Sequence, residues 1–106
     1  MKYCCVFSTA PSLKKARELA GLLVSGRFAA CVSILPGLES RYRWQGKQEA
    51  SKECLLLIKT TVSRYKKVEK VLLKYHPYEV PEIICLPVTK GSKSYLDWIS
   101  GEVIAS

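Results

Sequence analysis

Two kinds of apolar pattern alternate along this chain, and their order limits the folds that it can adopt. Four segments rich in apolar and β-forming residues, which is typical of strands, occupy residues 3–9, 28–46, 53–61 and 82–91. Two further segments, 10–27 and 60–76, repeat apolar residues every three or four positions, as amphipathic helices do. A short final helix is predicted over residues 92–106.

The order strand, helix, strand, strand, helix, strand predicts an α+β domain of the ferredoxin-like kind. In this β-α-β-β-α-β arrangement one antiparallel sheet carries both helices on the same face. Because 106 residues are too few for two hydrophobic cores, we expect a single domain over residues 1–106, with an extra C-terminal helix. Ser12 is placed to cap the first helix, and Gly26 is placed at its end.

The second and third strands are longer than a four-stranded sheet requires. Pro36-Gly37 interrupts the second strand, because proline cannot donate to a strand ladder, and residues 46–52 have the composition of a polar turn. Before that turn, Tyr42 and Trp44 alternate with arginines, so the two rings share one face. We expect this hairpin to project past the helices, beside a sheet face that nothing obvious in the sequence covers. Such a surface predicts self-assembly.

Charge and cysteine content exclude several classes of protein. The 17 lysines and arginines exceed the 9 acidic residues to give a net charge of +8, but they form no dense tract, so nucleic acid is not an expected partner. The chain has no segment of membrane-spanning length and no signal peptide, so no membrane association is expected. Its five cysteines are odd in number and lack a C-x-x-C pair. We therefore expect a cytoplasmic protein with reduced thiols.

The single histidine, His76, lies in the segment 74–84, KYHPYEVPEII. In one interpretation it is a metal ligand or a polar pocket residue, assisted by Glu79 or Glu82 and by a thiol from elsewhere. In the other, it ends the second helix, where its ring interacts favourably with the helix dipole before a proline stops the helix. Under both interpretations the two prolines hold Tyr78 and the glutamates in a rigid segment, which suits a preformed pocket as well as a connector.

Other residues offer alternative sites. Tyr42 and Trp44 could stack nucleobases, but the glycine and aromatic run of RNA-recognition domains is missing, so we favour packing between subunits. Lys59 with Thr60, near the start of the second helix, could hold an anion, although no glycine-rich loop accompanies them. The basic face of that helix is interpreted as a solvated surface formed by Arg64, Lys66, Lys67, Lys70 and Lys74.

Catalysis and thiol chemistry receive little support from the residue patterns. No nucleophile motif accompanies His76, so we do not expect an enzyme, and a hydrolase built on that imidazole is only a third alternative. Cys4 and Cys5 are neighbours on a strand and point to opposite faces, so they cannot chelate one ion together. Cys31, Cys54 and Cys85 lie inside apolar strand segments, where most cysteines are buried and structural.

Four motifs follow one another at intervals that match a known family. They are AACVSILPGLESRYRWQGK, LLLIKTT, HPYEVPEII and YLDWI. Together they resemble the CutA family of divalent-cation-tolerance proteins over nearly the whole chain. The resemblance implies a ferredoxin-like subunit in an interlocked homotrimer, whose long hairpins add strands to neighbouring sheets, with an architecture similar to that of PII signalling proteins. It also implies a link to tolerance of copper and other divalent metals.

The resemblance further implies candidate site residues. Some bacterial members associated with copper carry a cysteine after the first strand and two adjacent histidines before Pro-Tyr, and the matching positions here are Ser8, Tyr75 and His76. Only His76 of that set is kept. Cys31 matches a cysteine that the family retains, so it is the candidate for a second soft ligand.

We therefore expect a trimeric cytoplasmic protein that binds a divalent metal such as copper, or a small ligand, in clefts between subunits. His76 and Cys31 are the predicted metal ligands. The predicted cleft residues are Tyr78, Glu79, Glu82, Lys59, Tyr42 and Trp44. The alternative is a non-catalytic trimeric scaffold or a PII-like signalling protein that engages a protein partner.

Overall fold

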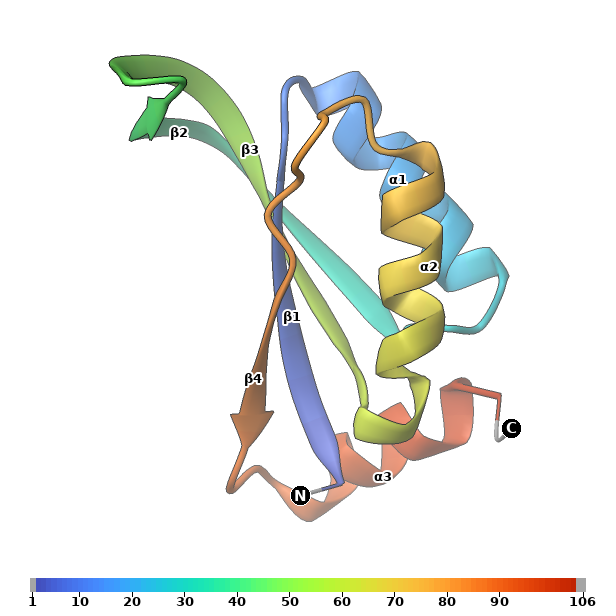
Figure 1. Ribbon diagram of the computed structural model, residues 1–106. Coiled ribbons are helices and arrows are strands. Elements are labelled where there is room, and N and C mark those ends of the chain that lie inside the picture. The colour runs from blue at the N-terminus through green and yellow to red at the C-terminus, as the bar shows by residue number, and fades with distance from the viewer. Residues whose placement is uncertain (1, 105–106) are drawn as a thin grey trace.

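The computed structural model describes residues 2–104, in which four strands, three α-helices and a 3₁₀ turn follow one another (Figure 1). They are β1 (Tyr3–Ala10), α1 (Leu13–Ser25), β2 (Cys31–Trp44), β3 (Lys47–Thr61), η1 (Val62–Arg64), α2 (Tyr65–Tyr75), β4 (Ile84–Val88) and α3 (Lys93–Glu102). The predicted α+β class and element order are confirmed. Met1 and the predicted helical residues 105–106 lie outside the described residues. No helix between residues 2 and 104 is long and apolar enough to cross a membrane.

The strands form one antiparallel sheet in the order β2-β3-β1-β4, and α1 and α2 lie side by side on one of its faces (Figure 1). Val6 of β1 and Ile58 of β3 are register partners on this face, and both are fully buried. Leu19 of α1 and Leu72 of α2 pack into the same core. The apolar face of each helix therefore meets the apolar face of the two inner strands.

The predicted ends of α1 are confirmed. The Ser12 hydroxyl accepts a hydrogen bond from the Lys15 amide at 3.1 Å, which caps the first turn. Gly26 follows the last helical residue, and its amide donates to the Leu22 carbonyl at 3.1 Å. A Cβ at Gly26 would lie 2.5 Å from a ring atom of Phe28, so the glycine lets Phe28 fold back against the helix end.

The start of α2 differs from the prediction. β3 continues to Thr61, and the turn η1 separates it from the helix, which begins at Tyr65. The interpretation of Arg64 as part of a solvated basic face is wrong, because only 4% of this residue is exposed. Its guanidinium lies 5.7 Å from the centre of the Phe28 ring, so packing against that ring withdraws it from solvent.

The hairpin between β2 and β3 is longer and more regular than predicted. Residues 47–52 belong to β3 instead of a turn, and the connection consists of Gln45 and Gly46, whose φ angles are 51° and 79°. β2 also passes through Pro36-Gly37 without ending, although its register with β3 shifts between Leu35 and Leu38. The tip of the hairpin curves away from both helices, as expected (Figure 1).

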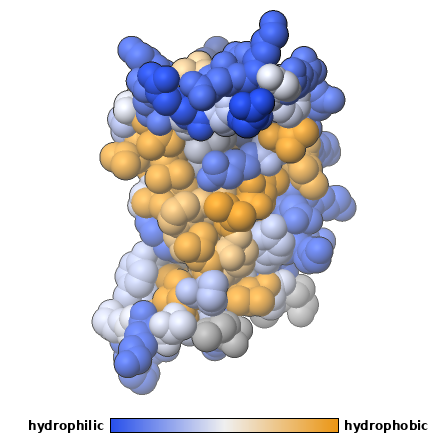
Figure 2. Space-filling model, turned by 60° about the vertical axis from the view of Figure 1, so that its left-hand side comes forward, coloured by the Kyte–Doolittle hydropathy of each residue, from blue (hydrophilic) through white to orange (hydrophobic). Residues whose placement is uncertain are grey.

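The sheet face opposite α1 and α2 is only partly covered. The helix α3 packs across one end of it, where Ile99 is buried and the Ser100 hydroxyl lies 2.7 Å from the Tyr3 hydroxyl. The rest of the face presents apolar side chains to solvent, including Leu35 at 55%, Ile84 at 53% and Leu86 at 41% exposure. Figure 2 shows apolar residues gathered on this side of the molecule. We refer to this region as the open sheet face.

The five cysteines are free thiols with different environments. Cys4 and Cys54 are buried, while Cys5 and Cys31 are partly exposed. The expected burial of Cys85 is wrong, because it lies on the edge strand β4 and is exposed.

Candidate functional site

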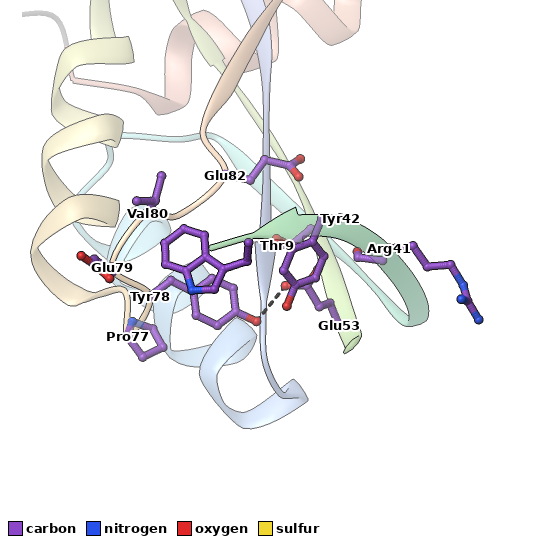
Figure 3. A pocket seen from close by; sticks show the side chains of 11 residues that line it. Thr9, Arg41, Tyr42, Glu53, Pro77, Tyr78, Glu79, Val80 and Glu82 are labelled. Atoms are coloured by element: carbon purple, nitrogen blue, oxygen red, sulfur yellow. Dashed lines mark hydrogen bonds between the residues drawn. The ribbon is translucent and has the colours of Figure 1, made fainter. Parts of the chain in front are cut away.

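A cleft of about 650 Å³ lies where the hairpin approaches the segment that follows α2 (Figure 3). It is lined by Thr9, Ser40, Arg41, Tyr42, Trp44, Glu53, Pro77, Tyr78, Glu79, Val80 and Glu82. The volume falls within the range of small-ligand sites. Five of the predicted cleft residues meet here: Tyr42, Trp44, Tyr78, Glu79 and Glu82.

His76 lies behind the cleft and holds two of its lining residues, Thr9 and Tyr78, through hydrogen bonds. It caps the C-terminus of α2 with an extended backbone, as expected for a residue before proline. Its ring is 8% exposed, and its Nε2–H donates to the carbonyl of Thr9 at 2.6 Å. Its Nδ1 accepts the amide N–H of Tyr78 at 3.1 Å. Both ring nitrogens are therefore hydrogen-bonded to backbone groups: Nε2 carries the proton, and the Nδ1 lone pair is already used, so neither nitrogen is free for a metal in this arrangement.

Tyr78 and Glu53 form a hydrogen-bonded pair in the cleft. The phenol of Tyr78 donates to Glu53 Oε2 at 2.7 Å (Figure 3). Burial, and then the hydrogen bond and charge of that carboxylate, raise the pKa of Tyr78 well above its ordinary value. The phenol therefore stays protonated and keeps donating well into the alkaline range. Two hydrogen bonds, one at its amide and one at its hydroxyl, hold the Tyr78 ring in place.

Sequence reasoning missed Glu53, which is 8% exposed although it carries a carboxyl group. The signal was a lone acidic residue immediately before the apolar run CLLLI, where a strand enters the core. A buried carboxylate needs a partner. The partner is supplied from 25 positions further along the chain, so only the fold identifies it.

The hairpin contributes the opposite wall. Tyr42 is 43% exposed and Trp44 is 40% exposed, and the Ser51 hydroxyl donates to the Tyr42 oxygen at 3.4 Å. Arg41 also lines the cleft, and its Nε lies 3.0 Å from Glu39 Oε2. The wall therefore combines exposed aromatic surface with an arginine that already has a carboxylate partner.

Cys31 and Lys59 lie away from this cleft. They are register partners on β2 and β3, at the level of Cys5 on β1, and the Lys59 ammonium bonds to the Ser33 hydroxyl. His76 instead contacts Thr9, four residues further along β1. At a strand rise of about 3.3 Å per residue, these two levels are about 13 Å apart. One chain therefore does not bring Cys31 and His76 to the same ion.

A divalent metal needs several donor atoms that converge on one point. Within residues 2–104, no three or more His, Cys, Asp or Glu side chains are grouped as metal ligands. Glu79 and Glu82 are both exposed, and in Figure 3 they are directed to different sides of the cleft. A single chain thus supplies separate carboxylates but no complete coordination shell.

The fold and the cleft together define a class of protein: a ferredoxin-like α+β subunit with a projecting hairpin and a candidate ligand site beside it. The family model of the "CutA1 divalent ion tolerance protein" matches residues 4–102. This chain therefore belongs to the CutA1 family, as its motifs predicted.

Individual relatives agree with this assignment. The divalent-cation tolerance protein CutA of Thermus thermophilus is 49% identical over 94 residues, which cover 89% of this chain and 91% of the relative. A chloroplastic CutA protein of Arabidopsis thaliana is 43% identical, and the match covers 89% of this chain but only 52% of the plant protein. The crystal structure of CutA1 from Oryza sativa superposes with a TM-score of 0.97 at 38% identity, covering 100% of this chain and 97% of that one.

Proposed function

We propose that this protein is a non-catalytic homotrimer of the divalent-cation response, which binds a small ligand or a divalent cation such as copper in clefts between subunits. The observation that carries the proposal is the combination of the open sheet face with a hairpin that projects past it. Leu35, Ile84 and Leu86 are each more than 40% exposed on that face. Contiguous apolar surface of this kind is typical of protein interfaces.

The cleft is the proposed binding site because one of its walls belongs to the hairpin. If the hairpin packs against a neighbouring subunit, that subunit closes the cleft and can add donor atoms. Of the three glutamates that line the cleft, Glu79 and Glu82 remain available to a cation, since Glu53 already accepts from Tyr78. Cys31 and His76 can serve one metal only if they come from different chains and if the His76 ring gives up one of its two backbone hydrogen bonds.

The test is calorimetric titration of copper and zinc salts into the assembled protein, with sedimentation of the same samples. We expect the double variant Glu79→Gln, Glu82→Gln to lose most of the heat of binding while it sediments as the wild type does. Glu18→Gln on α1, an exposed carboxylate outside the cleft, is the matched control and should bind normally. Equal binding by both variants would remove the cleft from the cation proposal.

A second candidate function is a scaffold or PII-like signalling protein that engages a protein partner. The observation favouring it is that the described residues of one chain form no group of metal ligands. Affinity capture from a native lysate should then recover a partner in fixed ratio to the trimer. Recovery of the trimer alone, together with saturable ligand binding at the cleft, would reject this alternative.

We place the protein in the cytoplasm. Five free thiols, two of them buried, support a reducing compartment. The Arabidopsis relative carries the description chloroplastic, so relatives are not confined to one compartment. Fractionation of cells that express the full-length chain, followed by immunodetection, tests the assignment, and recovery outside the cytosolic fraction would contradict it.

A further inference from the structure

The cleft is chemically unlike the rest of the protein surface. The chain as a whole has a net charge of +8, yet three carboxyl residues, Glu53, Glu79 and Glu82, line the cleft. The one cationic side chain in the lining, Arg41, is paired with Glu39 at 3.0 Å. A cation approaching an otherwise repulsive surface therefore finds a locally favourable site there.

The same cleft is rich in aromatic surface. Tyr42, Trp44 and Tyr78 all line it, and the first two are 43% and 40% exposed. The faces of such rings attract ammonium groups, and aromatic sites combined with carboxylates are a general solution for quaternary ammonium ligands. A metal ion instead needs several donor atoms converging on one point, which this chain does not group within residues 2–104.

One of the rings, that of Tyr78, is held in place by two hydrogen bonds. The Tyr78 amide is tied to His76 at 3.1 Å, and the Tyr78 hydroxyl is tied to Glu53 at 2.7 Å. A ligand that packs on this ring therefore pays little to order it. The volume of about 650 Å³ leaves room for a small organic molecule in addition to its cationic head.

We propose that the cleft binds an organic cation carrying a methylated ammonium group, which packs against Tyr42, Trp44 and Tyr78, while Glu79 and Glu82, on different sides of the cleft, balance its charge without both contacting it. This inference rests on the proposed function, because it names the chemical class of the small ligand. Two kinds of molecule carry such a methylated ammonium group: a free quaternary amine and a trimethylated lysine of another protein.

The experiment compares choline with 3,3-dimethylbutan-1-ol, which has the same shape but no charge. Both are titrated into the assembled full-length protein and followed by calorimetry and by line broadening of the ligand NMR signals. N-acetyl-trimethyllysine amide is a third probe, and the tighter of the two ammonium probes identifies the source. We expect the ammonium probes to bind at least about fivefold more tightly than the neutral alcohol.

Variants then locate the binding site. Trp44→Leu and the double variant Glu79→Gln, Glu82→Gln should each weaken ammonium binding by about fivefold to tenfold. Trp98→Leu is the matched control, since Trp98 is similarly exposed at 43% but lies on α3 outside the cleft. It should bind as the wild type does.

The outcomes separate this inference from the function on which it rests. Equal affinity for choline and the alcohol, or no binding of any ammonium probe, overturns the organic-cation inference even if every variant misfolds. Cleft-dependent binding of copper or zinc in the same samples would then leave the proposed function in place. Loss of both kinds of binding in a protein that still assembles would reject the cleft as a ligand site altogether.

Discussion

His76 illustrates how one side chain can organise a site without being part of its exposed surface. Its ring joins the end of β1 to the segment after α2 through the Thr9 carbonyl and the Tyr78 amide. Its ring centre also lies 4.7 Å from that of Tyr78. The imidazole therefore acts as a buried connector in this conformation.

Replacing His76 by alanine should destabilise the protein by about 2 kcal/mol or more, because a buried acceptor and a buried donor lose their partners. Urea unfolding of the two proteins measures the difference. His76→Gln keeps a terminal amide near the Thr9 carbonyl and should cost less. An alanine variant as stable as the wild type would show that these hydrogen bonds contribute nothing.

Ionisation of the Tyr65 phenol makes the stability of the folded protein change with pH in the alkaline range. Burial, followed by the hydrogen bond to Glu69 at 2.8 Å, raises the pKa of Tyr65 from 10.0 to about 12. The folded state therefore holds the phenolic proton more tightly than the unfolded state does. This contribution is complete below pH 10 and is lost as the pH rises from about 10 to 12.

Denaturant unfolding at several pH values between 9 and 12 checks this expectation, and Tyr65→Phe should show a shallower loss of stability than the wild type. Some loss remains in the variant, because burial also raises the pKa of Tyr78 and of Cys4. Parallel curves for the two proteins would contradict the assignment.

The hairpin depends on a turn with unusual backbone angles. Gln45 and Gly46 both have positive φ, which is the two-residue geometry that matches the twist of antiparallel strands. A Cβ at Gly46 would meet nothing within 4 Å, so its glycine is required by the backbone conformation and not by crowding.

Gly46→Ala should therefore lower the free energy of unfolding by about 1 kcal/mol, and Gln45→Asn should raise it slightly. Thermal and urea unfolding measure both changes. Gly21→Ala is the matched control: this glycine lies in α1 with open space around it, so alanine there should stabilise by about 0.5–1 kcal/mol. If Gly46→Ala left the free energy of unfolding unchanged, the turn would have to relax to another geometry.

The open sheet face is the surface that we propose copies of the chain bury when they associate. Its most exposed apolar residues lie on the two edge strands of the sheet, Leu35 on β2 and Ile84 and Leu86 on β4. If the face is buried in a trimer, association and folding are coupled, and the midpoint of thermal unfolding should rise with protein concentration.

Leu86→Glu should place a charge in that interface, shift sedimentation toward a monomer and remove the concentration dependence. Leu73→Glu is the control, because Leu73 is 58% exposed and lies on α2, which covers the opposite face of the sheet. A wild-type midpoint that does not change over a hundredfold range of concentration would argue against a dissociable trimer.

Patterns among neighbouring residues were sufficient to predict much of the fold. Strand and helix periodicity, the Ser12 cap and Gly26 at the end of α1 depend on neighbours within a few positions, so each could be predicted directly. The order and spacing of the four motifs also identified the family. The polar composition of residues 46–52 led to the wrong prediction of a turn there. Pairing with β2 outweighs the weak turn preference of polar residues.

The site was decided by contacts between distant segments. Tyr78 meets Glu53, and His76 meets Thr9, across 25 and 67 positions. Periodicity carries no information about such pairs, since they depend on sheet register and on where α2 ends. For the same reason the sequence alone named Cys31 and His76 together, whereas strand register places them at different levels of the sheet.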